Sequence, residues 1–254
     1  MSARPQPLAW LEPGEYFPPV TQAWADGTEA PGLLAAGGDL TVGSLIRAYS
    51  QGIFPWYSQG QPILWWSTHP RMVLNTAEFR LHRSLRQHLQ KFRLRADCEI
   101  RFDFAFERVI QACATHCRAG QTGTWIQPEM VQAYVALHRA GLAHSVETWV
   151  QGELVGGLYC VALGQAVFGE SMFAHASDAS KTALAGLVAF CRQHDMAQID
   201  CQQNTQHLAS LGAREVPREQ FLQAIAQAQK RPAPHWKFEP IYWQNILPEP
   251  STSS

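Results

Sequence analysis

Two spacings of apolar residues alternate along the chain and indicate a protein that mixes helices with strands. Apolar residues three or four positions apart predict helices over 41–52, 104–117, 127–141, 180–195 and 217–229. Alternating or short continuous apolar runs predict strands over 143–150, 154–163, 165–173 and 196–202. Short turns join the first three of these strands, which predicts an antiparallel meander.

The segment from 165 to 202 determines how the last two strands are connected. A strand, a helix and a second strand follow one another there, an order typical of a crossover between two parallel neighbours. We therefore predict an α+β fold that has a mixed sheet with flanking helices. Prolines and glycines are dense in the first thirty residues, and further prolines interrupt the segment that follows. We place a domain boundary there, between a small N-terminal domain over 1–70 and the main domain over 71–254.

Composition and charge narrow the class of protein. The chain has 254 residues, 46% of them hydrophobic, and a formal net charge of -1 at pH 7. Its overall field would not attract a nucleic acid, so any such partner needs a local basic patch. The first residues lack a basic run followed by an apolar core, and no apolar stretch approaches the roughly 20 residues that span a bilayer. We expect a cytoplasmic protein without a membrane partner.

Cysteine usage gives no sign of a disulfide framework or a metal centre. Six cysteines are scattered through the chain, and we interpret them as reduced thiols. The densest group is CATHC at 113–117, a Cys/His/Cys set without a second cluster, which is incomplete for a structural zinc site. Buried helix cysteines are the better interpretation, and no metal is expected.

Polar and reactive side chains crowd into IDCQQNTQHLASLGA, at 199–213, where the last predicted strand ends. Successive side chains of a strand alternate, so Asp200 and Gln202 share one face, while Ile199 and Cys201 face the covering helix. A reactive thiol needs a partly exposed, electropositive setting, which makes Cys201 a weak candidate nucleophile. Asp200 and Gln202 lie at a strand end, where α/β sites are common. The alternative is a local hydrogen-bond pair that fixes the next turn.

Glu170 interrupts the apolar strand over 165–173. Alternation puts Phe168 and Met172 on its own face. The carboxylate then needs a partner, because burying an unpaired charge is costly. A structural arginine and a cationic substrate are equally good partners at this stage.

The segment FRLHRSLRQHLQKFRLR, at 79–95, is the strongest basic run of the chain and contains no acidic residue. Its cations are Arg80, Arg83, Arg86, Lys91, Arg93 and Arg95. A solvated helix face and a phosphate-binding surface account for this run equally well.

Several long motifs, in order, resemble one family. The chain is similar to the leucyl/phenylalanyl-tRNA–protein transferases from about residue 31 to residue 221, through GLLAAGGDLTVGSLIRAYSQGIFPWYSQGQPILWWSTHPR, GTWIQPEMVQAYVALHRAGLAHSVE, GGLYCVALGQAVFGESMF, ASKTAL and IDCQQNTQHLASLGA. The resemblance implies a GNAT-like acyltransferase domain behind a small N-terminal domain. It also implies an enzyme that moves Leu or Phe, and less readily Met, from aminoacyl-tRNA to a protein with N-terminal Arg or Lys, which marks that protein for the N-degron pathway.

Two other functions stay open: a GNAT-like amine acyltransferase with another acyl donor, and an RNA-binding module without activity. GNAT enzymes that use acetyl-coenzyme A usually carry a glycine-rich pyrophosphate loop. The corresponding stretch here, AHASDASKTAL, contains no glycine, so coenzyme A is not expected. We expect no other cofactor. We expect a monomer whose partners are aminoacyl-tRNA and the acceptor protein.

The resemblance assigns roles to single residues. Asp200 and Gln202 form the catalytic pair, in which Gln202 accepts a hydrogen bond from the attacking amine and Asp200 orients or polarises it. Glu170 binds the cationic acceptor, and Trp56 and Trp125 contact the 3′ adenosine, with core packing as the alternative for either tryptophan. The other positions are an apolar aminoacyl pocket (Leu158, Val167, Met172, Leu184, Leu187, Ile199), two loop-shaping residues (Thr205, His207) and a tRNA-phosphate surface (Arg80, Arg83, Arg86, Lys91, Arg93).

The implied reaction is aminolysis of an ester, which needs no covalent enzyme intermediate. An α-amine has a pKa near 7.7 to 8.0, so an appreciable minority is neutral at cellular pH. Alignment of the reactants can supply about 7 to 11 kcal/mol, and proton management roughly 10²- to 10⁴-fold in rate. Amides and carboxylates suit this chemistry better than a thiol does.

Overall fold

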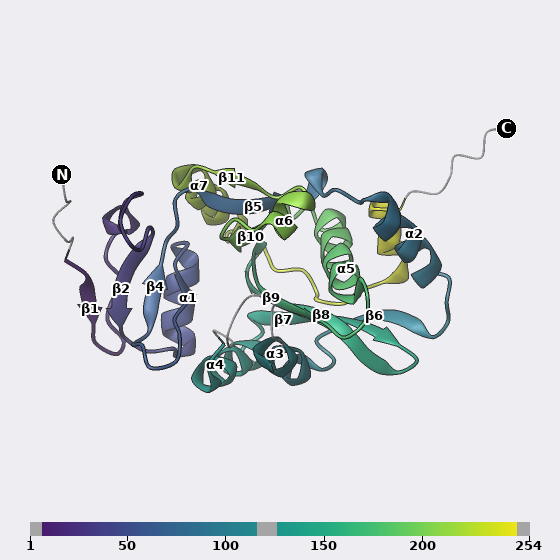
Figure 1. Cartoon of the computed structure of the whole chain (residues 1–254), viewed down its shortest axis with the longest axis horizontal. Coiled ribbons are helices and arrows are strands. Elements are labelled where there is room, and N and C mark those ends of the chain that lie inside the picture. Colours follow the sequence, from purple (N-terminus) through teal and green to yellow (C-terminus); the bar gives the residue numbers. More distant parts are fainter. Residues whose placement is uncertain (1–6, 116–125, 248–254) are drawn as a thin grey trace.

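The structure is a computed structural model of the chain and describes residues 7–115 and 126–247. Two β-sheets organise it (Figure 1). The strands are β1 (Ala9–Leu11), β2 (Leu33–Gly37), β3 (Phe54–Pro55), β4 (Leu64–Trp66), β5 (Arg71–Asn75), β6 (Cys98–Phe102), β7 (Ala143–Val150), β8 (Glu153–Leu163), β9 (Ala166–Ala174), β10 (Gln198–Gln202) and β11 (Arg214–Val216). The α-helices are α1 (Val42–Ser50), α2 (Arg83–Phe92), α3 (Phe106–Thr115), α4 (Pro128–Arg139), α5 (Ala179–Gln193), α6 (Gln206–Ser210) and α7 (Arg218–Ala228). Short 3-10 helices are η1 (Val20–Gln22), η2 (Thr76–Glu78) and η3 (Pro240–Asn245).

The smaller sheet lies at the N-terminal end of the molecule and has the strand order β1-β2-β4-β3. Helix α1 begins after Thr41, whose side chain accepts a hydrogen bond from the backbone N–H of Ser44. The helix stops before Gly52, which has a φ of +71° and so takes the left-handed conformation that suits a helix end. The helix, with Thr41 before it and Gly52 after it, thus coincides with the range predicted from the apolar spacing, 41–52.

The larger sheet has the strand order β11-β5-β10-β9-β8-β7-β6. Strands β6 to β9 pair antiparallel in sequence, and β10 pairs parallel with β9 and antiparallel with β5. Helix α5 connects β9 to β10. The antiparallel meander, the crossover and the α+β class with a mixed sheet are all as predicted from the apolar pattern.

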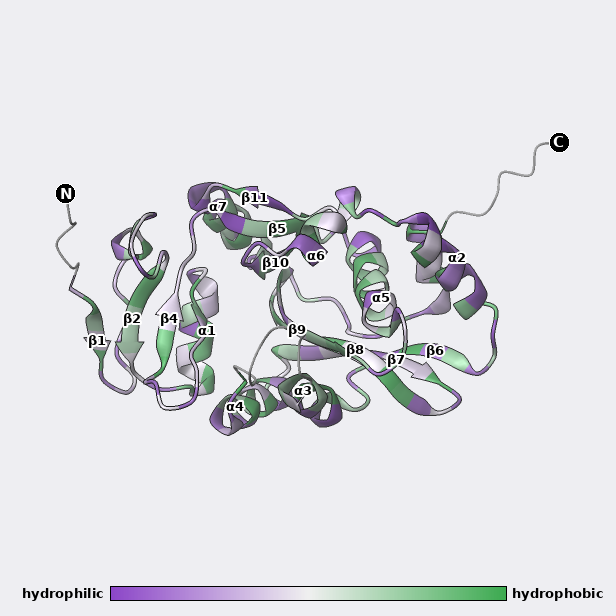
Figure 2. Ribbon diagram, viewed as in Figure 1, coloured by the Kyte–Doolittle hydropathy of each residue, from purple (hydrophilic) through white to green (hydrophobic). Residues whose placement is uncertain are grey.

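Helices cover both faces of the larger sheet (Figure 1). Helix α5 packs on one face together with α2 and η3, while α3 and α4 pack on the other. Figure 2 shows α5 as predominantly hydrophobic and α2 as a helix with a hydrophilic outer face. At the start of α5 the packing is close, because a Cβ added to Gly156 would lie 2.5 Å from the Cβ of Ala179. None of the helices in the described residues is long and apolar enough to cross a membrane.

The change from one sheet to the other falls between Trp66 and Arg71. This agrees with a boundary near residue 70. A single apolar cluster nevertheless contains residues of both parts, including Trp65 and Phe54 from the smaller sheet and Phe168 from the larger one. The division into domains of 1–70 and 71–254 therefore stays a prediction.

Strands β9 and β10 are irregular at the same level of the sheet. In β9, Gly169 pairs with Cys160 and Ser171 with Tyr159, so Glu170 is an extra residue in the ladder. In β10, Asp200 and Gln202 pair with consecutive residues of β5, so Cys201 is likewise extra. Bulges of this kind bend a strand and redirect side chains. Here they lie where the parallel pairing of β9 with β10 reaches its last partners, Phe168 and Asp200.

Candidate active site

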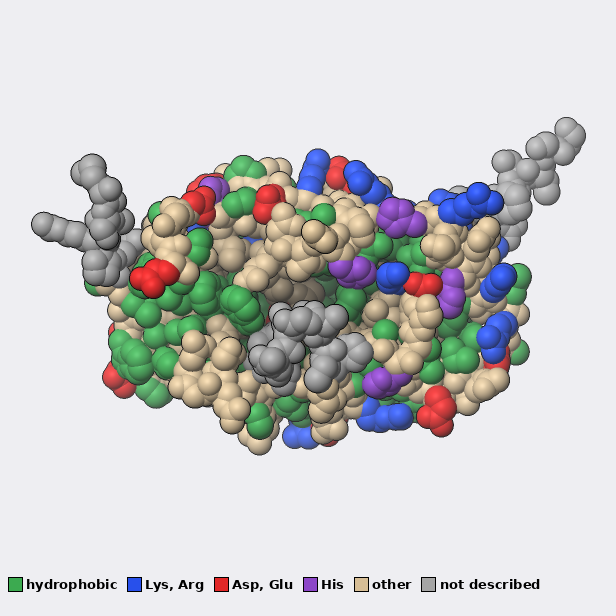
Figure 3. Space-filling model, viewed as in Figure 1, with side chains coloured by type: hydrophobic (Ala, Val, Ile, Leu, Met, Phe, Trp, Pro, Cys, Tyr) green, Lys and Arg blue, Asp and Glu red, His purple; other side chains and the backbone are tan. Residues whose placement is uncertain are grey.

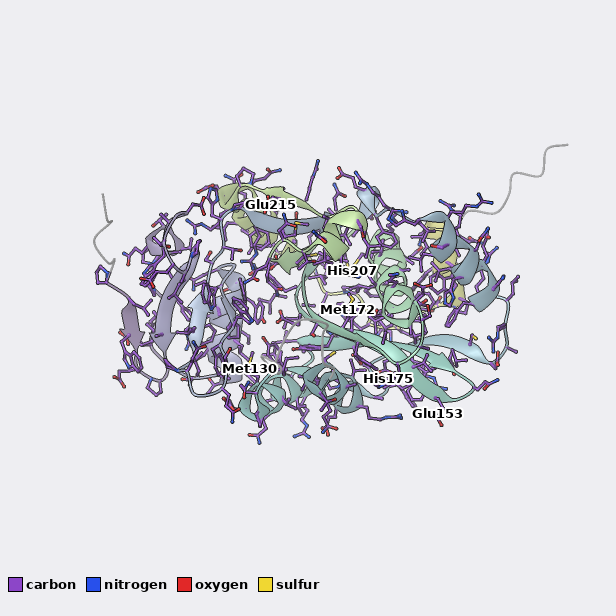
Figure 4. The ribbon with its side chains drawn as sticks, in the orientation of Figure 1. Met130, Glu153, Met172, His175, His207 and Glu215 are labelled. Carbon is purple, nitrogen blue, oxygen red and sulfur yellow. The ribbon has the colours of Figure 1, made fainter. Side chains whose placement is uncertain are left out.

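A pocket of about 470 Å³ opens beside the two bulges. Residues of β3 form one wall, β8 and β9 another, α5 a third, and β10 with the start of α6 completes the lining. Figure 4 labels Met172 of β9 and His207 of α6, which lie near each other and both line this pocket. The smaller and the larger sheet thus both contribute residues to the same cavity.

The predicted aminoacyl pocket is largely assembled in this cavity. Five of its six residues line the cavity: Leu158, Met172, Leu184, Leu187 and Ile199. Val167 does not, and its inclusion was wrong. Its side chain is buried in the core, in the apolar cluster that contains residues of α5. Both loop-shaping residues line the cavity, and the Thr205 side chain caps α6 by accepting the backbone N–H of Leu208 at 3.2 Å.

Glu170 lies in a chain of hydrogen bonds that crosses from the smaller part of the molecule to β10. The Tyr134 hydroxyl donates to its Oε2 at 3.2 Å, and the Gln202 side-chain amide donates to its Oε1 at 3.0 Å. Tyr134 also shares a 2.5 Å hydrogen bond with the hydroxyl of Tyr49 on α1. Four elements, α1, α4, β9 and β10, therefore fix the position of this carboxyl group.

The electrostatic surroundings of Glu170 favour its protonated form. Burial raises the pKa of Glu170 from 4.5 to about 8, and the nearby charge of Asp200 acts in the same direction. The hydroxyls of Tyr49 and Tyr134 and the charge of Arg71 oppose this rise without cancelling it. A cation that entered the pocket beside Glu170 would therefore favour loss of the proton.

Glu170 and Met172 lie on opposite faces of β9. Phe168 lies on the side of α4, in the same cluster as Tyr134, and Glu170 bonds to Tyr134. Met172 packs on the opposite side, against the cluster that contains α5. The prediction that Met172 shares the face of Glu170 was wrong, because the bulge at Glu170 shifts the alternation by one residue.

Asp200 is held in a buried ion pair. Arg71 Nε donates to Oδ1 at 2.8 Å and Arg71 Nη2 donates to Oδ2 at 2.6 Å, and each side chain is only 1% exposed. The guanidinium lies between the rings of Phe54 and Phe221, 4.8 and 4.6 Å from their centroids. A structural arginine is therefore present, but it pairs with Asp200 rather than with Glu170.

Gln202 has an unusual backbone for a residue with a side chain. Its φ is 56°, in the left-handed region. Its backbone N–H donates to Asp200 Oδ1 at 2.9 Å, and its carbonyl oxygen accepts from the Thr68 hydroxyl at 2.9 Å. Asp200 thus contacts the backbone of Gln202, and its part in the catalytic pair, which the resemblance implies, stays a prediction.

The two faces of β10 carry the residues that alternation assigned to them. Ile199 belongs to the cluster that contains α5, and Cys201 packs against the same cluster. Asp200 and Gln202 instead contact Arg71 and Glu170. Burial and the charge of Asp200 raise the pKa of the Cys201 thiol to about 12, so the thiolate is scarce at neutral pH.

One of the two predicted adenosine-binding tryptophans lies in the wall of the pocket. Trp56 lines the pocket, is 37% exposed and packs against Trp66 with their ring centroids 5.4 Å apart. Its exposed part is available for stacking. Trp125 lies outside the described residues.

Residues 73–226 match the family model described as leucyl/phenylalanyl-tRNA protein transferase, and residues 38–69 match the model of that family's N-terminal domain. The chain belongs to this family. A Polaromonas sp. strain JS666 protein named leucyl/phenylalanyl-tRNA–protein transferase is 64% identical over 97% of each chain. A protein of the same name from Albidiferax ferrireducens is 61% identical over 100% of each chain.

Among solved structures, a GCN5-related N-acetyltransferase-like protein from Streptococcus suis 89/1591 has a TM-score of 0.32 and 16% identity. The match covers 68% of this chain and 64% of that one. This likeness is too low to support a conclusion about the fold, which follows from the sheets and helices described above.

Four residues around the site were not predicted from the sequence. Arg71 is followed by three apolar residues in β5, and a buried carboxylate at Asp200 requires a cation, so these two signals together could have identified it. Thr68, Tyr49 and Tyr134 carry no such signal. Hydroxyls on amphipathic helices and in loops are common, and only the fold brings these three to β9 and β10.

The predicted phosphate-binding cations lie on α2 and next to its two ends. Leu85, Leu89 and Phe92 bury one side of that helix, and the cations Arg80, Arg83, Arg86 and Lys91 are exposed, while Arg93 is half-buried. Figure 3 shows lysine and arginine side chains gathered toward the α2 end of the molecule. Phosphate binding by this surface stays a prediction. Within the described residues, no three His, Cys, Asp or Glu side chains are grouped to hold a metal ion.

Proposed function

We propose that the protein transfers leucine or phenylalanine, and less readily methionine, from aminoacyl-tRNA to the α-amine of proteins that begin with Arg or Lys. The observation that carries the proposal is the hydrogen bond from the Gln202 amide to Glu170 in the wall of the apolar pocket. It unites an amide and a carboxyl group beside the space for an aminoacyl side chain. Membership of the transferase family supports the same activity.

The pocket binds the aminoacyl end of the tRNA. Its five apolar lining residues exclude water from a leucine or phenylalanine side chain, and full burial of such a side chain stabilises by about 1.5 to 3 kcal/mol. Trp56 stacks on the 3′ adenosine, an interaction of about 1 to 3 kcal/mol. The exposed cations of α2 hold acceptor-stem phosphates, because a protein with a net charge of -1 needs a local basic surface for RNA.

Glu170 binds the side chain of the acceptor's first residue. A guanidinium or ammonium group displaces the proton of this carboxyl group and forms charge-assisted hydrogen bonds with the carboxylate. An acceptor that begins with a neutral residue leaves Glu170 protonated and gains no such bond. The preference for Arg or Lys follows from this difference.

Gln202 aligns the nucleophile. Its side-chain N–H faces Glu170, so its carbonyl oxygen is the end of the amide that accepts a hydrogen bond from the attacking α-amine. The amine nitrogen bonds to the ester carbonyl carbon, the carbon–oxygen bond to the ribose breaks, and the ribose oxygen leaves with the proton that the amine loses. The product is a peptide bond and a free tRNA 3′ hydroxyl.

The protein acts in the cytoplasm as a monomer, and the added residue marks the acceptor for the N-degron pathway.

The test uses purified protein, radiolabelled Leu-tRNA or Phe-tRNA and a peptide that begins with Arg, without acetyl-coenzyme A. Label should pass to this peptide and far less to a matched peptide that begins with Ala. Glu170→Gln should raise KM for the Arg peptide, while Glu215→Gln, an exposed control on β11, should not. Absence of transfer to every basic N-terminus would refute the proposal.

A further inference from the structure

The backbone of Gln202 requires an external restraint. A left-handed φ of 56° is unfavourable for a residue with a side chain, and such conformations persist where the surrounding structure enforces them. This conformation coincides with the bulge of β10 and with the turn of the Gln202 amide toward Glu170. Whatever holds the backbone therefore also sets the direction of the amide.

Both backbone polar groups of Gln202 are held by one cluster. Asp200 Oδ1 accepts its N–H at 2.9 Å, and the Thr68 hydroxyl donates to its carbonyl oxygen at 2.9 Å. Arg71 connects the two anchors, since it makes two hydrogen bonds to Asp200 and its Nη1 lies 3.5 Å from Thr68 Oγ1. We call Thr68, Arg71 and Asp200 the backbone clamp.

Packing surrounds Arg71, the central residue of the clamp. Its guanidinium lies over the rings of Phe54 and Phe221, and its side chain is 1% exposed. Phe54 comes from the smaller sheet and Phe221 from α7, so both parts of the molecule fix this group. An arginine this deeply buried does not reach a substrate in the pocket.

We propose that Arg71 and Thr68 are positioning residues, which hold Gln202 in its left-handed conformation and so aim its amide at Glu170 and at the attacking amine. This inference rests on the proposed function. It assigns Asp200 a part in the same clamp, because both of its oxygens are engaged by Arg71 and one also by the backbone of Gln202. Loss of the clamp lowers the rate of the chemical step and leaves substrate binding intact.

The kinetic test compares paired variants. Thr68→Val removes the hydroxyl at nearly constant volume, and Arg71→Lys keeps the charge but loses the two-pronged contact. We expect kcat to fall about 10-fold for Thr68→Val and about 100-fold for Arg71→Lys, with KM for both substrates within twofold of the unaltered protein. Thr68→Ser should restore most of kcat.

Two control variants remove similar groups away from the site. Thr76→Val deletes a hydroxyl that donates to the carbonyls of Met196 and Ala197, and Arg192→Lys alters an arginine that donates to the carbonyls of Thr76 and Asn245. Both controls should keep kcat within twofold. Equal losses in the controls and the clamp variants would overturn the inference, because they would indicate general destabilisation.

A second measurement does not depend on catalysis. The side-chain amide of Gln202 gives a ¹H–¹⁵N signal that Gln202→Glu identifies by its loss. Thr68→Val and Arg71→Lys should shift this signal and lower its heteronuclear NOE, and the controls should leave it unchanged. An unmoved signal, or unchanged kcat in Thr68→Val, would overturn the clamp. If the unaltered protein transfers no amino acid, the proposed function fails, and the amide signal still decides whether the clamp exists.

Discussion

Replacement of Glu170 by glutamine tests the electrostatic basis of the site without use of a substrate. Glutamine keeps the size of the side chain and its ability to bond to Gln202 and Tyr134, but it does not titrate. In the folded protein the pKa of Glu170 is raised from 4.5 to about 8. Ionisation of this residue therefore opposes folding in the unaltered protein and not in the variant.

The size and the pH range of the effect follow from this pKa. One pKa unit corresponds to about 1.36 kcal/mol, so the whole shift corresponds to about 5 kcal/mol. Because the folded pKa is the higher one, the stability contributed by the protonated carboxyl is fully present below pH 4.5 and is lost as the pH rises through 8. Between pH 5 and pH 8.5 the loss amounts to about 4 kcal/mol.

Urea unfolding at several pH values measures this loss. The free energy of unfolding of Glu170→Gln minus that of the unaltered protein should grow by about 4 kcal/mol between pH 5 and pH 8.5, which corresponds to roughly 8 to 16 °C in Tm. Glu215→Gln, an exposed carboxyl on β11, is the control and should run parallel to the unaltered protein. If the profile of Glu170→Gln is also parallel, Glu170 ionises as freely as a surface residue, and the reasoning about its protonation is wrong.

Three further predictions concern other residues of the site. Trp56→Ala should raise KM for aminoacyl-tRNA about 5- to 150-fold, because it removes a stacking contact of about 1 to 3 kcal/mol, and Trp56→Phe should recover part of the lost affinity. Equal KM values for Trp56→Ala and the unaltered protein would show that Trp56 serves only in packing. The pair Arg83→Glu and Arg86→Glu should weaken tRNA binding and reduce the slope of log Kd against log salt by up to about 2, which filter binding at several salt concentrations checks; an unchanged slope would place the phosphates elsewhere. Cys201→Ala should keep kcat within about threefold across pH 6 to 9, because the pKa of the thiol is about 12; loss of all transfer would instead indicate a thiolate nucleophile.

Local sequence patterns predicted the parts of the site that depend on alternation and short-range order. The apolar spacing predicted the meander, the crossover helix and the facing of β10, so Asp200 and Gln202 were placed on the side away from Cys201. These features follow from neighbours in sequence, since a strand alternates with a period of two and a short turn forces antiparallel pairing. A solvated helix face was one of the two interpretations of the basic run at 79–95, and the cations of α2 are exposed.

Local patterns did not predict the bulges of β9 and β10. Met172 was assigned the wrong face because an extra residue at Glu170 interrupts the alternation. Val167 was assigned to the pocket, but its side chain is buried in the core. A bulge depends on what the neighbouring strand and the covering helices demand, so one strand's sequence does not reveal it.

The sequence by itself determined the class of fold, the order of its elements and the set of polar residues at the end of β10. Only the tertiary structure decided their partners, because Arg71 is 129 residues from Asp200 along the chain and Tyr49 is 85 residues from Tyr134. Contacts over such separations arise from the packing of whole elements, which no local pattern encodes. The raised pKa of Glu170 and the left-handed backbone of Gln202 are consequences of that packing, and the reactivity proposed for this pocket depends on both.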